Sequence, residues 1–338
     1  MLYTKHLKKD ELYPLGTFSE FIVHELPNYN GKSDYNTAID KIEQLLPDVE
    51  RIMHLTYYTS FQTRMLALGD LGISLVTCKL GQRVPKKLIA SLQAIANTVG
   101  IVPRDNFPSY ITYNPTQALR TYTGDENEKN FILHIQKSQK AMATMIQELL
   151  LLQENPVTNN RLHILQSTSQ SIGILKKETS LVHKDVDPTF FFQMFRKYFF
   201  PIEIGEGIYS SPSAVHLPEL ILIDVITGCA DKKRLQMIPD FYPYLEPTYK
   251  LHIQRALQTP SLKEYYIINK VNNNFEKELV LLNQIFDDLV YFRLTHQGVV
   301  TRYIRKQDAS VQFGTGGFPF DTFLQELITM GKEAKTQI

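Results

Sequence analysis

The stretch FEKELVLLNQIFDDLVYFRLTHQGVVTRYIR, residues 275–305, carries a long helical pattern of apolar side chains. Its members are spaced by three, four or seven residues, which places them on one face of an α-helix. At 1.5 Å per residue this helix would be roughly 45 Å long. The face consists of Phe275, Leu279, Leu282, Phe286, Leu289, His296, Val300 and Tyr303. We therefore expect a long, partly buried helix within an all-α fold.

Helical signals dominate the rest of the chain as well, and strand-like alternation is scarce. Helical pattern after Asp240 is interrupted by prolines, and residues 102–125 are predicted to be irregular because they contain three prolines. We place a domain boundary in that irregular stretch, between a smaller N-terminal domain (1–118) and a large helical domain (119–338). Periodicity and capping residues predict further helices over residues 40–58, 66–75, 86–99, 126–153, 159–181, 187–199, 218–227 and 320–330.

The composition is that of an ordinary globular protein, with 43% hydrophobic and 21% charged residues in a chain of 338. The net charge of +1 gives no reason to expect nucleic acid or an anionic membrane as a partner. We expect no membrane span, because the apolar runs are short, and no signal peptide, because no apolar core follows the lysines of residues 1–14. Cys78 and Cys229 form no motif, which favours a reducing compartment and a cytoplasmic location.

His296 lies on the apolar face of the long helix, and Gly298 follows two residues later. Glycine inside a helix costs about 1 kcal/mol relative to alanine, so it usually marks a close approach. A flat, bulky group against this face would account for both residues, and haem, whose common protein ligand is histidine, is such a group. The helical pattern alone favours a plainer interpretation: a core histidine bonded to a backbone carbonyl, beside a glycine that lets another helix pack.

Arg196 ends the run DPTFFFQMFR, residues 187–196. Asp187 and Pro188 predict the start of a helix on which Phe192 and Arg196 share a face. A guanidinium can hold a carboxylate through two parallel hydrogen bonds while neighbouring rings contact an aromatic group. In isolation a solvent-exposed arginine is the better interpretation, because Lys197 follows directly.

The glycine-rich segment GTGG, residues 314–317, predicts a flexible loop with exposed backbone N–H groups and one hydroxyl. Such a loop can close over the polar end of a ligand, although a plain connection between helices is the alternative. It is not a phosphate-binding P-loop, because no Gly-Lys-Ser/Thr follows. The sequence also lacks the ligand patterns of structural zinc, zincin and carboxylate di-iron sites, and the nucleophile elbow of α/β-hydrolases.

Several motifs stand in an order that carries family information: Arg196 after Asp-Pro-x-Phe-Phe-Phe, Ser213-Ala before a helix ending DVITG (224–228), FRLTHQGVVTRYI (292–304) and GTGG (314–317). Together they resemble the indoleamine 2,3-dioxygenase family. The similarity is closer to the pyrrolnitrin-pathway branch of that family, monodechloroaminopyrrolnitrin synthase. The motifs of that branch are YNPT (113–116), RTYTG (120–124), PIEIGEGIY (201–209) and FYPYLEPTY (241–249). The resemblance covers residues 113–330 well and the N-terminal part loosely.

This resemblance implies an all-α fold of the indoleamine 2,3-dioxygenase type, with a helical haem domain and a smaller N-terminal domain that caps the distal side. It implies a b-type haem with His296 as the iron ligand and Gly298 beside it. Arg196 matches the arginine that binds the substrate carboxylate, and Phe191 and Phe192 match residues of the pocket wall.

The resemblance also implies roles for residues outside these two segments. Thr315, next to Gly316, matches the loop hydroxyl that reaches the polar end of the amino acid. Ser213 matches a dioxygenase serine beside the haem, although the pyrrolnitrin branch has glycine there. Three further residues are expected near the distal pocket by their match to the branch motifs, namely Tyr113, Tyr122 and Thr123. No catalytic acid or base is assigned.

The implied function is the O2-dependent modification of L-tryptophan or a ring-substituted tryptophan. Both oxygen atoms could be inserted across the indole 2,3-bond, or a chlorinated tryptophan could be rearranged to an aminophenylpyrrole. The sequence leaves these outcomes open, and it leaves the oligomeric state open. Two alternatives also remain: a haem hydroxylase or peroxygenase of a tyrosine-like amino acid, and a helical binding protein without a cofactor.

Overall fold

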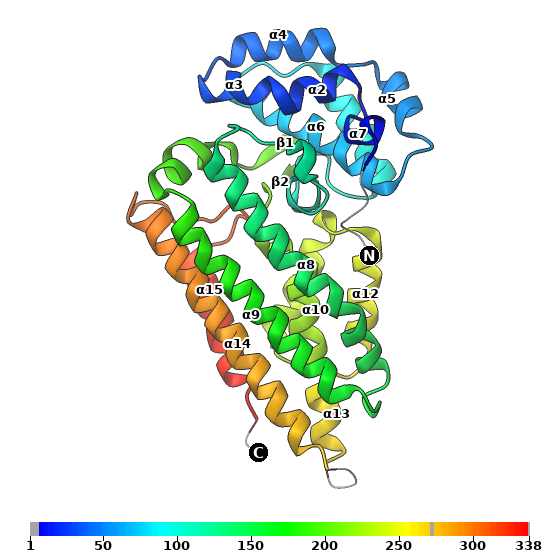
Figure 1. The fold of residues 1–338 in the computed structure, drawn as a ribbon, viewed down its shortest axis with the longest axis vertical. Coiled ribbons are helices and arrows are strands. Elements are labelled where there is room, and N and C mark those ends of the chain that lie inside the picture. The colour runs from blue at the N-terminus through cyan, green and yellow to red at the C-terminus, as the bar shows by residue number, and fades with distance from the viewer. Residues whose placement is uncertain (1–6, 271–273, 337–338) are drawn as a thin grey trace. The chain divides into compact units, whose positions relative to one another are not determined.

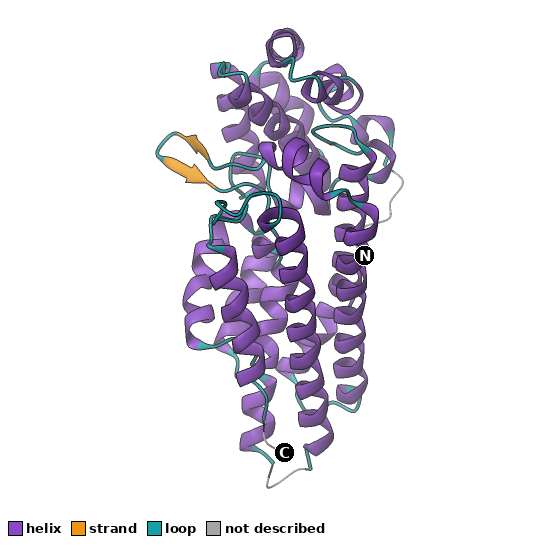
Figure 2. Ribbon diagram, turned by 90° about the vertical axis from the view of Figure 1, so that its left-hand side faces the viewer, coloured by secondary structure: helices purple, strands orange, loops and turns teal. Residues whose placement is uncertain are grey.

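The computed structural model describes residues 7–270 and 274–336, and most of them are helical (Figures 1 and 2). Three short turns are π-helical, at Pro108–Thr112, Phe190–Phe195 and Thr301–Arg305. The strands of the described residues are β1 (Ile202–Ile204) and β2 (Gly207–Tyr209). The helices are α1 (Lys9–Leu12), α2 (Thr17–His24), α3 (Leu26–Gly31), α4 (Tyr35–Leu45), α5 (Val49–Thr56), α6 (Phe61–Leu80), α7 (Lys86–Val99), α8 (Glu126–Glu154), α9 (Arg161–Asp185), α10 (Pro218–Thr227), α11 (Lys232–Phe241), α12 (Pro247–Gln258), α13 (Leu262–Ile268), α14 (Glu276–Val300) and α15 (Phe320–Glu333).

The chain divides into two compact units that are discontinuous in sequence. The N-terminal unit contains Met1–Leu133, Val186–His216 and Thr315–Gly317. The bundle unit contains His134–Asp185, Leu217–Gly314 and Phe318–Ile338. The predicted division into a smaller N-terminal domain, 1–118, and a large helical domain, 119–338, stays a prediction.

The bundle unit is built around α14, which packs along α9 and α15 (Figure 1). The predicted stripe of α14 is buried at Leu279, Leu282, Phe286 and Leu289. Burial of these side chains removes apolar surface from water, which is the main force holding such a helix in place. The prediction of a long, core-facing helix is confirmed, although α14 ends at Val300 and continues as a π-helical turn.

Several predicted helices have the expected bounds, and one is divided. Residues 86–99 and 218–227 form α7 and α10 as predicted, and both helices end at a left-handed glycine. Residues 40–58 were predicted as one helix but form parts of α4 and α5. Leu46 is extended at the break, with ψ of 117°, because the residue before a proline avoids the helical region.

The sequence pattern did not predict the β1–β2 hairpin. Its strands pair antiparallel, with Ile202 opposite Tyr209. Gly205 begins the two-residue turn with φ of +62°, a conformation that favours glycine. Both ends of the hairpin are tied to one buried arginine, since Arg104 Nη1 donates to the carbonyl oxygens of Phe200 and Tyr209 at 2.9 Å. Strands of three residues are too short to give a clear alternating pattern.

The N-terminal unit packs α6 against α2, α4 and α7. A buried ion pair joins α6 to the segment before α8: Arg120 Nε donates to Asp70 Oδ1 at 2.8 Å, and Ser19 Oγ donates to Asp70 Oδ2 at 2.6 Å. Such a pair is costly to break, because removal of one partner leaves a buried charge. None of the helices in the described part of the chain has the length and apolarity needed to span a bilayer.

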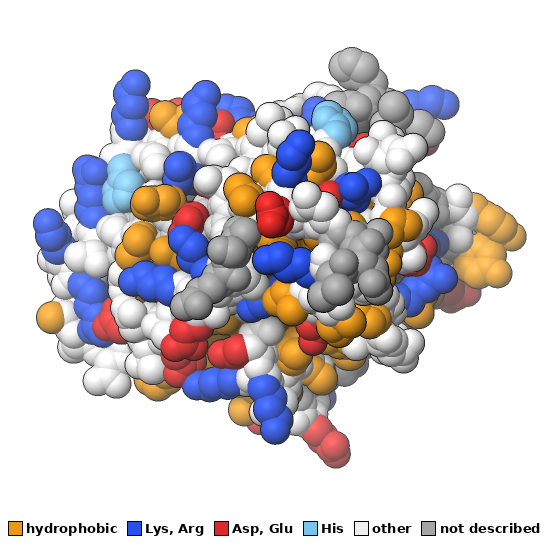
Figure 3. Space-filling view, turned by 90° about the horizontal axis from the view of Figure 1, so that it is seen from below, with side chains coloured by type: hydrophobic (Ala, Val, Ile, Leu, Met, Phe, Trp, Pro, Cys, Tyr) orange, Lys and Arg blue, Asp and Glu red, His pale blue; other side chains and the backbone are white. Residues whose placement is uncertain are grey.

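Figure 3 shows one face of the molecule, on which basic and acidic side chains are interspersed with apolar ones. The mixed signs agree with the near-neutral net charge. The expectation that no nucleic acid binds stays a prediction.

Gly72 gives a sharp test of the packing in the N-terminal unit. A Cβ at Gly72 would lie 2.2 Å from the backbone nitrogen of Asp105 and 2.7 Å from its Cα. Because backbone atoms must move, we expect Gly72→Ala to cost about 3 kcal/mol or more, the upper end for overpacking. Gly173→Ala on α9 is the control, since nothing lies within 4 Å and alanine should gain up to about 1 kcal/mol. Urea unfolding measures both, and equal midpoints for Gly72→Ala and wild type would refute this packing.

Candidate functional site

His296 lies on the last turns of α14 and is half-buried. The ring of Phe292, one turn earlier, is parallel to it at 6.1 Å between centroids. Burial lowers the pKa of His296 to about 4, so its imidazole is neutral near pH 7. Neither ring nitrogen forms a hydrogen bond with any residue that the structure describes. A neutral imidazole with an uncommitted lone pair is the form that binds a metal ion. The alternative of a core histidine bonded to a carbonyl does not match this geometry.

Gly298 is exposed on the same helix. A Cβ at this position would approach no described atom closer than His183 Nε2, at 3.9 Å, which is ordinary contact. Packing inside the bundle unit therefore does not require glycine here, and the interpretation that Gly298 admits a second helix lacks support. The neutral imidazole of His296, which has no hydrogen-bond partner among the described residues, fits a group that is bound through one imidazole.

A buried ion pair fixes α14 one turn before His296. Arg293 Nη2 donates to Asp224 Oδ1 on α10 at 2.6 Å, and Arg293 Nη1 donates to the carbonyl oxygen of Leu327 on α15 at 3.0 Å. Sequence reasoning quoted Arg293 and Asp224 within motifs but gave them no role. The signal was present, because Arg293 follows Leu289 by four residues and precedes His296 by three, which places it on the same stripe.

The segment from Phe190 to Tyr198 departs from the predicted α-helix. Asp187 Oδ1 accepts from the backbone nitrogen of Phe190 at 2.7 Å, so the predicted start is confirmed. The chain then forms a π-helical turn in which Arg196 N–H donates to the carbonyl oxygen of Phe191. The predicted α-helix is therefore replaced here by a π-helical turn, in which five residues, not four, separate the bonded groups.

Arg196 is half-buried, and burial lowers the pKa of its guanidinium. The rings before it form a cluster, since Phe195 is perpendicular to Phe191 at 5.6 Å and to Phe199 at 4.8 Å. Phe192 is half-buried in the same turn. The turn thus presents one cation beside aromatic side chains, a combination that suits a ligand with a carboxylate and a flat ring.

The glycine-rich loop has a hydrogen-bonded base, which we call the neck (Gly314 and Phe318), and a packed tip (residues 315–317). At the neck, Gly314 N–H donates to the carbonyl oxygen of Phe318 at 2.9 Å. At the tip, Ser211 Oγ donates to the carbonyl oxygen of Thr315 at 2.9 Å. A Cβ at Gly316 would meet Ser213 Oγ at 2.8 Å and Val215 Cγ1 at 2.7 Å. The structure therefore brings three predicted residues together, namely Ser213, Thr315 and Gly316.

This packing gives a prediction with a matched control. Gly316→Ala should displace the loop tip, because its Cβ would overlap two side chains. Gly314→Ala should be tolerated, since its nearest contact is 3.7 Å away. We expect backbone amides of residues 315–317 to exchange roughly tenfold faster or more in Gly316→Ala, as a loss of about 1.4 kcal/mol implies. Hydrogen exchange with mass spectrometry measures this, and identical protection in the two variants would contradict the packing.

The remaining predicted residues lie in the N-terminal unit and are well anchored. Tyr113 is buried against Phe61, with 5.6 Å between ring centroids. Thr123 donates through both its backbone N–H and its hydroxyl to Glu128 Oε2, at 2.7 and 2.6 Å. Tyr122 also donates its backbone N–H to Glu128. Glu128, which sequence reasoning missed, organises this loop, and burial raises the pKa of its carboxyl.

Tyr122 links this loop to the segment that carries Arg196. Its ring stacks on Tyr198, two residues after Arg196, at 4.6 Å and 7°. Its hydroxyl donates to Asp105, and burial together with that carboxylate raises the pKa of Tyr122 well above its usual value. Tyr122 is therefore a neutral, fixed support. Arg104 completes the network by donating to Asp105 at 2.9 Å.

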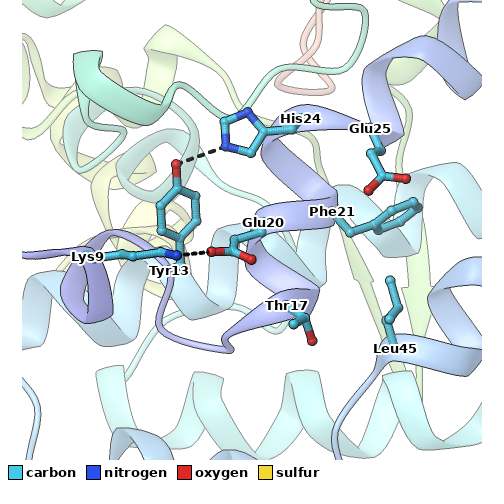
Figure 4. A pocket seen from close by; sticks show the side chains of 8 residues that line it. All are labelled: Lys9, Tyr13, Thr17, Glu20, Phe21, His24, Glu25 and Leu45. Atoms are coloured by element: carbon cyan, nitrogen blue, oxygen red, sulfur yellow. Dashed lines mark hydrogen bonds and ion pairs between the residues drawn. The ribbon is translucent and has the colours of Figure 1, made fainter.

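A half-open pocket of about 490 Å³ lies elsewhere in the N-terminal unit, among α1, α2 and α4 (Figure 4). Figure 4 shows Tyr13 bonded to His24, and Lys9 paired with Glu20. None of the predicted site residues lines this pocket. The remaining lining residues are Thr17, Phe21, Glu25 and Leu45.

The sequence model of the monodechloroaminopyrrolnitrin synthase family matches residues 14–316, which is most of the chain and includes His296, Arg196 and Gly316. This family consists of haem-dependent enzymes with a helical fold of the indoleamine 2,3-dioxygenase type. The all-α model agrees with that fold. The chain belongs to the monodechloroaminopyrrolnitrin synthase family and is a haem-dependent, tryptophan-modifying enzyme.

Proposed function

We propose that this enzyme binds one b-type haem through His296 and uses O2 to modify L-tryptophan or a ring-substituted tryptophan. The observation that carries the proposal is the neutral, unbonded imidazole of His296 on α14, in a chain that matches a haem-dependent family over residues 14–316. Arg293 and Asp224 support it, because they hold the helix one turn away.

In this proposal α14 supplies the iron ligand. His296 would donate its lone pair, which is available because burial keeps the ring deprotonated. Gly298 would present no side chain beside it, and Ser213 is the proposed polar neighbour of the cofactor. When bound, the haem supplies the oxygen chemistry.

Arg196 and the residues near it in sequence supply the proposed substrate contacts. Arg196 would bind the carboxylate of the amino acid through two hydrogen bonds, since its planar guanidinium matches that shape. Phe191 and Phe192 would contact the indole ring. Thr315, beside Gly316, would reach the polar end of the amino acid.

Three further residues would line or support the same region. Tyr113 and Thr123 are proposed to border the distal side. Tyr122 would act mainly as a support, because its hydroxyl is already engaged by Asp105. This arrangement would keep Arg196 in place through the Tyr122–Tyr198 stack.

Two reaction outcomes are compatible with these contacts. One inserts both atoms of O2 across the indole 2,3-bond and gives an N-formylkynurenine. The other is an oxidative rearrangement to an aminophenylpyrrole. The family match favours the rearrangement, since the matching family is named for a pyrrolnitrin precursor.

Product analysis tests the function directly. The reduced protein is given O2 and, in turn, tryptophan, 7-chlorotryptophan, tyrosine and tryptamine, and products are identified by mass spectrometry. Use of ¹⁸O2 separates the outcomes, because dioxygenation adds two labelled atoms and an aminophenylpyrrole contains none. Turnover only with peroxide and tyrosine would refute the proposal, as would a purified protein without a Soret band.

The loop at residues 314–317 is proposed to close over the bound amino acid. Its neck is fixed by the Gly314–Phe318 hydrogen bond, so movement is expected at the tip. We expect amides of residues 315–317 to become more protected when tryptophan binds, by roughly tenfold or more, because closure removes local opening. Hydrogen exchange with and without tryptophan measures the effect. Equal protection would argue against a lid.

A further inference from the structure

The interior of the bundle unit holds two arginines for one aspartate. Asp224 on α10 accepts from Arg293 Nη2 at 2.6 Å, so this pair is satisfied. Arg234 on α11 lies at the same carboxylate, but its Nε is 3.8 Å from Asp224 Oδ2, too far for a hydrogen bond. Asp231 is the other nearby carboxylate; it lies on the exposed start of α11 and accepts from the backbone nitrogen of Arg234. Arg234 is therefore held near Asp224 by charge alone, without a hydrogen bond.

The guanidinium of Arg234 is buried with unsatisfied donors. Its side chain is 7% exposed, and neither Nε nor Nη1 has a hydrogen-bond partner among the residues that the structure describes. Two phenylalanine rings enclose it, with Phe241 at 5.2 Å and Phe323 at 5.8 Å. Phe318 packs against both rings, at 5.9 and 5.1 Å.

A buried guanidinium whose N–H donors lack acceptors is costly, because the hydrogen bonds that it made to water are not replaced. Most buried polar groups have partners, so unsatisfied arginine donors call for an anion. The planar guanidinium favours a carboxylate, which can accept two parallel hydrogen bonds. The enclosing rings would keep water out and strengthen such a contact.

We propose that Arg234 binds a carboxylate of the haem, a propionate, and so helps to anchor the cofactor in the bundle unit. This inference rests on the proposed binding of haem through His296. It is supported by position within one unit, since Arg234 and Arg293 share Asp224 and Arg293 precedes His296 by three residues, a rise of roughly 4.5 Å along α14. The amino-acid substrate already has Arg196 as the proposed partner of its carboxylate.

The test uses the full chain freed of haem and titrated with haem or with haem dimethyl ester, whose propionates carry no charge. We expect wild type to bind haem roughly tenfold more tightly than the ester, or more, as one charge-assisted hydrogen bond implies. Arg234→Met should reduce this preference by about tenfold. Lys233→Met is the matched control, because Lys233 is an exposed neighbour paired with Glu326, and it should keep the wild-type preference.

A second measurement separates anion binding from a purely structural role. Without haem, Arg234→Met should melt at the same temperature as wild type or higher, because it removes a buried group whose N–H donors lack acceptors while Asp224 keeps its hydrogen bond to Arg293. A clear fall in the melting temperature of the haem-free variant would show that Arg234 serves the fold, and would overturn the proposal.

The remaining outcomes are also decisive. An unchanged preference for haem over its ester in Arg234→Met would refute the propionate contact and leave haem binding through His296 intact. Stabilisation of the haem-free protein by chloride or acetate that depends on Arg234, with an unchanged haem preference, would show a small-anion site instead. Failure of wild type to take up haem at all would refute the proposed function itself.

Discussion

His296→Ala is expected to fold and to lose its haem. The imidazole is the proposed protein ligand to the iron, and changes in residues that only orient a ligand already cost about 10- to 100-fold in metal affinity. Removal of the ligand itself should therefore weaken haem binding by more than about 100-fold. Titration of the haem-free protein, followed by the Soret band, measures the affinity. The fold should survive, because His296 is half-buried and bonds to no described residue.

The controls for this variant exploit other parts of the bundle unit. His163→Ala on α9 should keep normal haem content, because His163 is exposed. Added imidazole should restore the Soret band of His296→Ala by entering the space left by the side chain, and it should not change His163→Ala. A full, unshifted haem spectrum in His296→Ala without imidazole would rule out His296 as the ligand.

Arg196→Leu is expected to abolish most of the discrimination between tryptophan and tryptamine. Tryptamine lacks the carboxylate, so it cannot form the proposed bidentate pair. Removing one partner of a buried charged pair typically costs about 2–5 kcal/mol, which is roughly 30- to 4,000-fold in affinity. Wild type should therefore prefer tryptophan by a factor of this order, and Arg196→Leu should bind the two ligands almost equally.

The measurement is favoured by the composition of the chain. It contains no tryptophan, so indole fluorescence reports only the ligand. Lys197→Leu is the matched control: Lys197 is the next residue, and its Nζ lies over the rings of Tyr198 and Tyr35 at 5.2 and 5.9 Å. Lys197→Leu should keep the preference for tryptophan. The haem content of both variants should equal that of wild type. Equal binding of tryptophan and tryptamine to wild type would remove the role of Arg196.

The positioning of Arg196 could not be derived from its own segment. The run of phenylalanines predicted an α-helix, but the chain adopts a π-helical turn at Phe190–Phe195. The stack of Tyr122 on Tyr198 fixes the chain just after that turn. This contact joins side chains far apart in sequence, so the segment alone could not predict it.

Local sequence determined the helical architecture. The spacing of three and four residues in 275–305 predicted α14 and its buried face, including the position of His296, because helical periodicity is a property of neighbouring residues alone. Gly100 and Gly228 marked the ends of α7 and α10, since both have positive φ. The order of short motifs predicted the family, which the match over residues 14–316 confirms.

Tertiary structure alone decided which charges are satisfied. Asp224 and Arg293 are 69 residues apart and form a buried pair, whereas Arg234 beside them keeps unbonded donors. Helical spacing places Arg293 on the buried stripe of α14, but it does not say which arginine finds acceptors, because hydrogen bonding arises only when α10, α11 and α14 have packed. The same holds for the lowered pKa of His296, since desolvation requires the folded surroundings that a sequence does not contain.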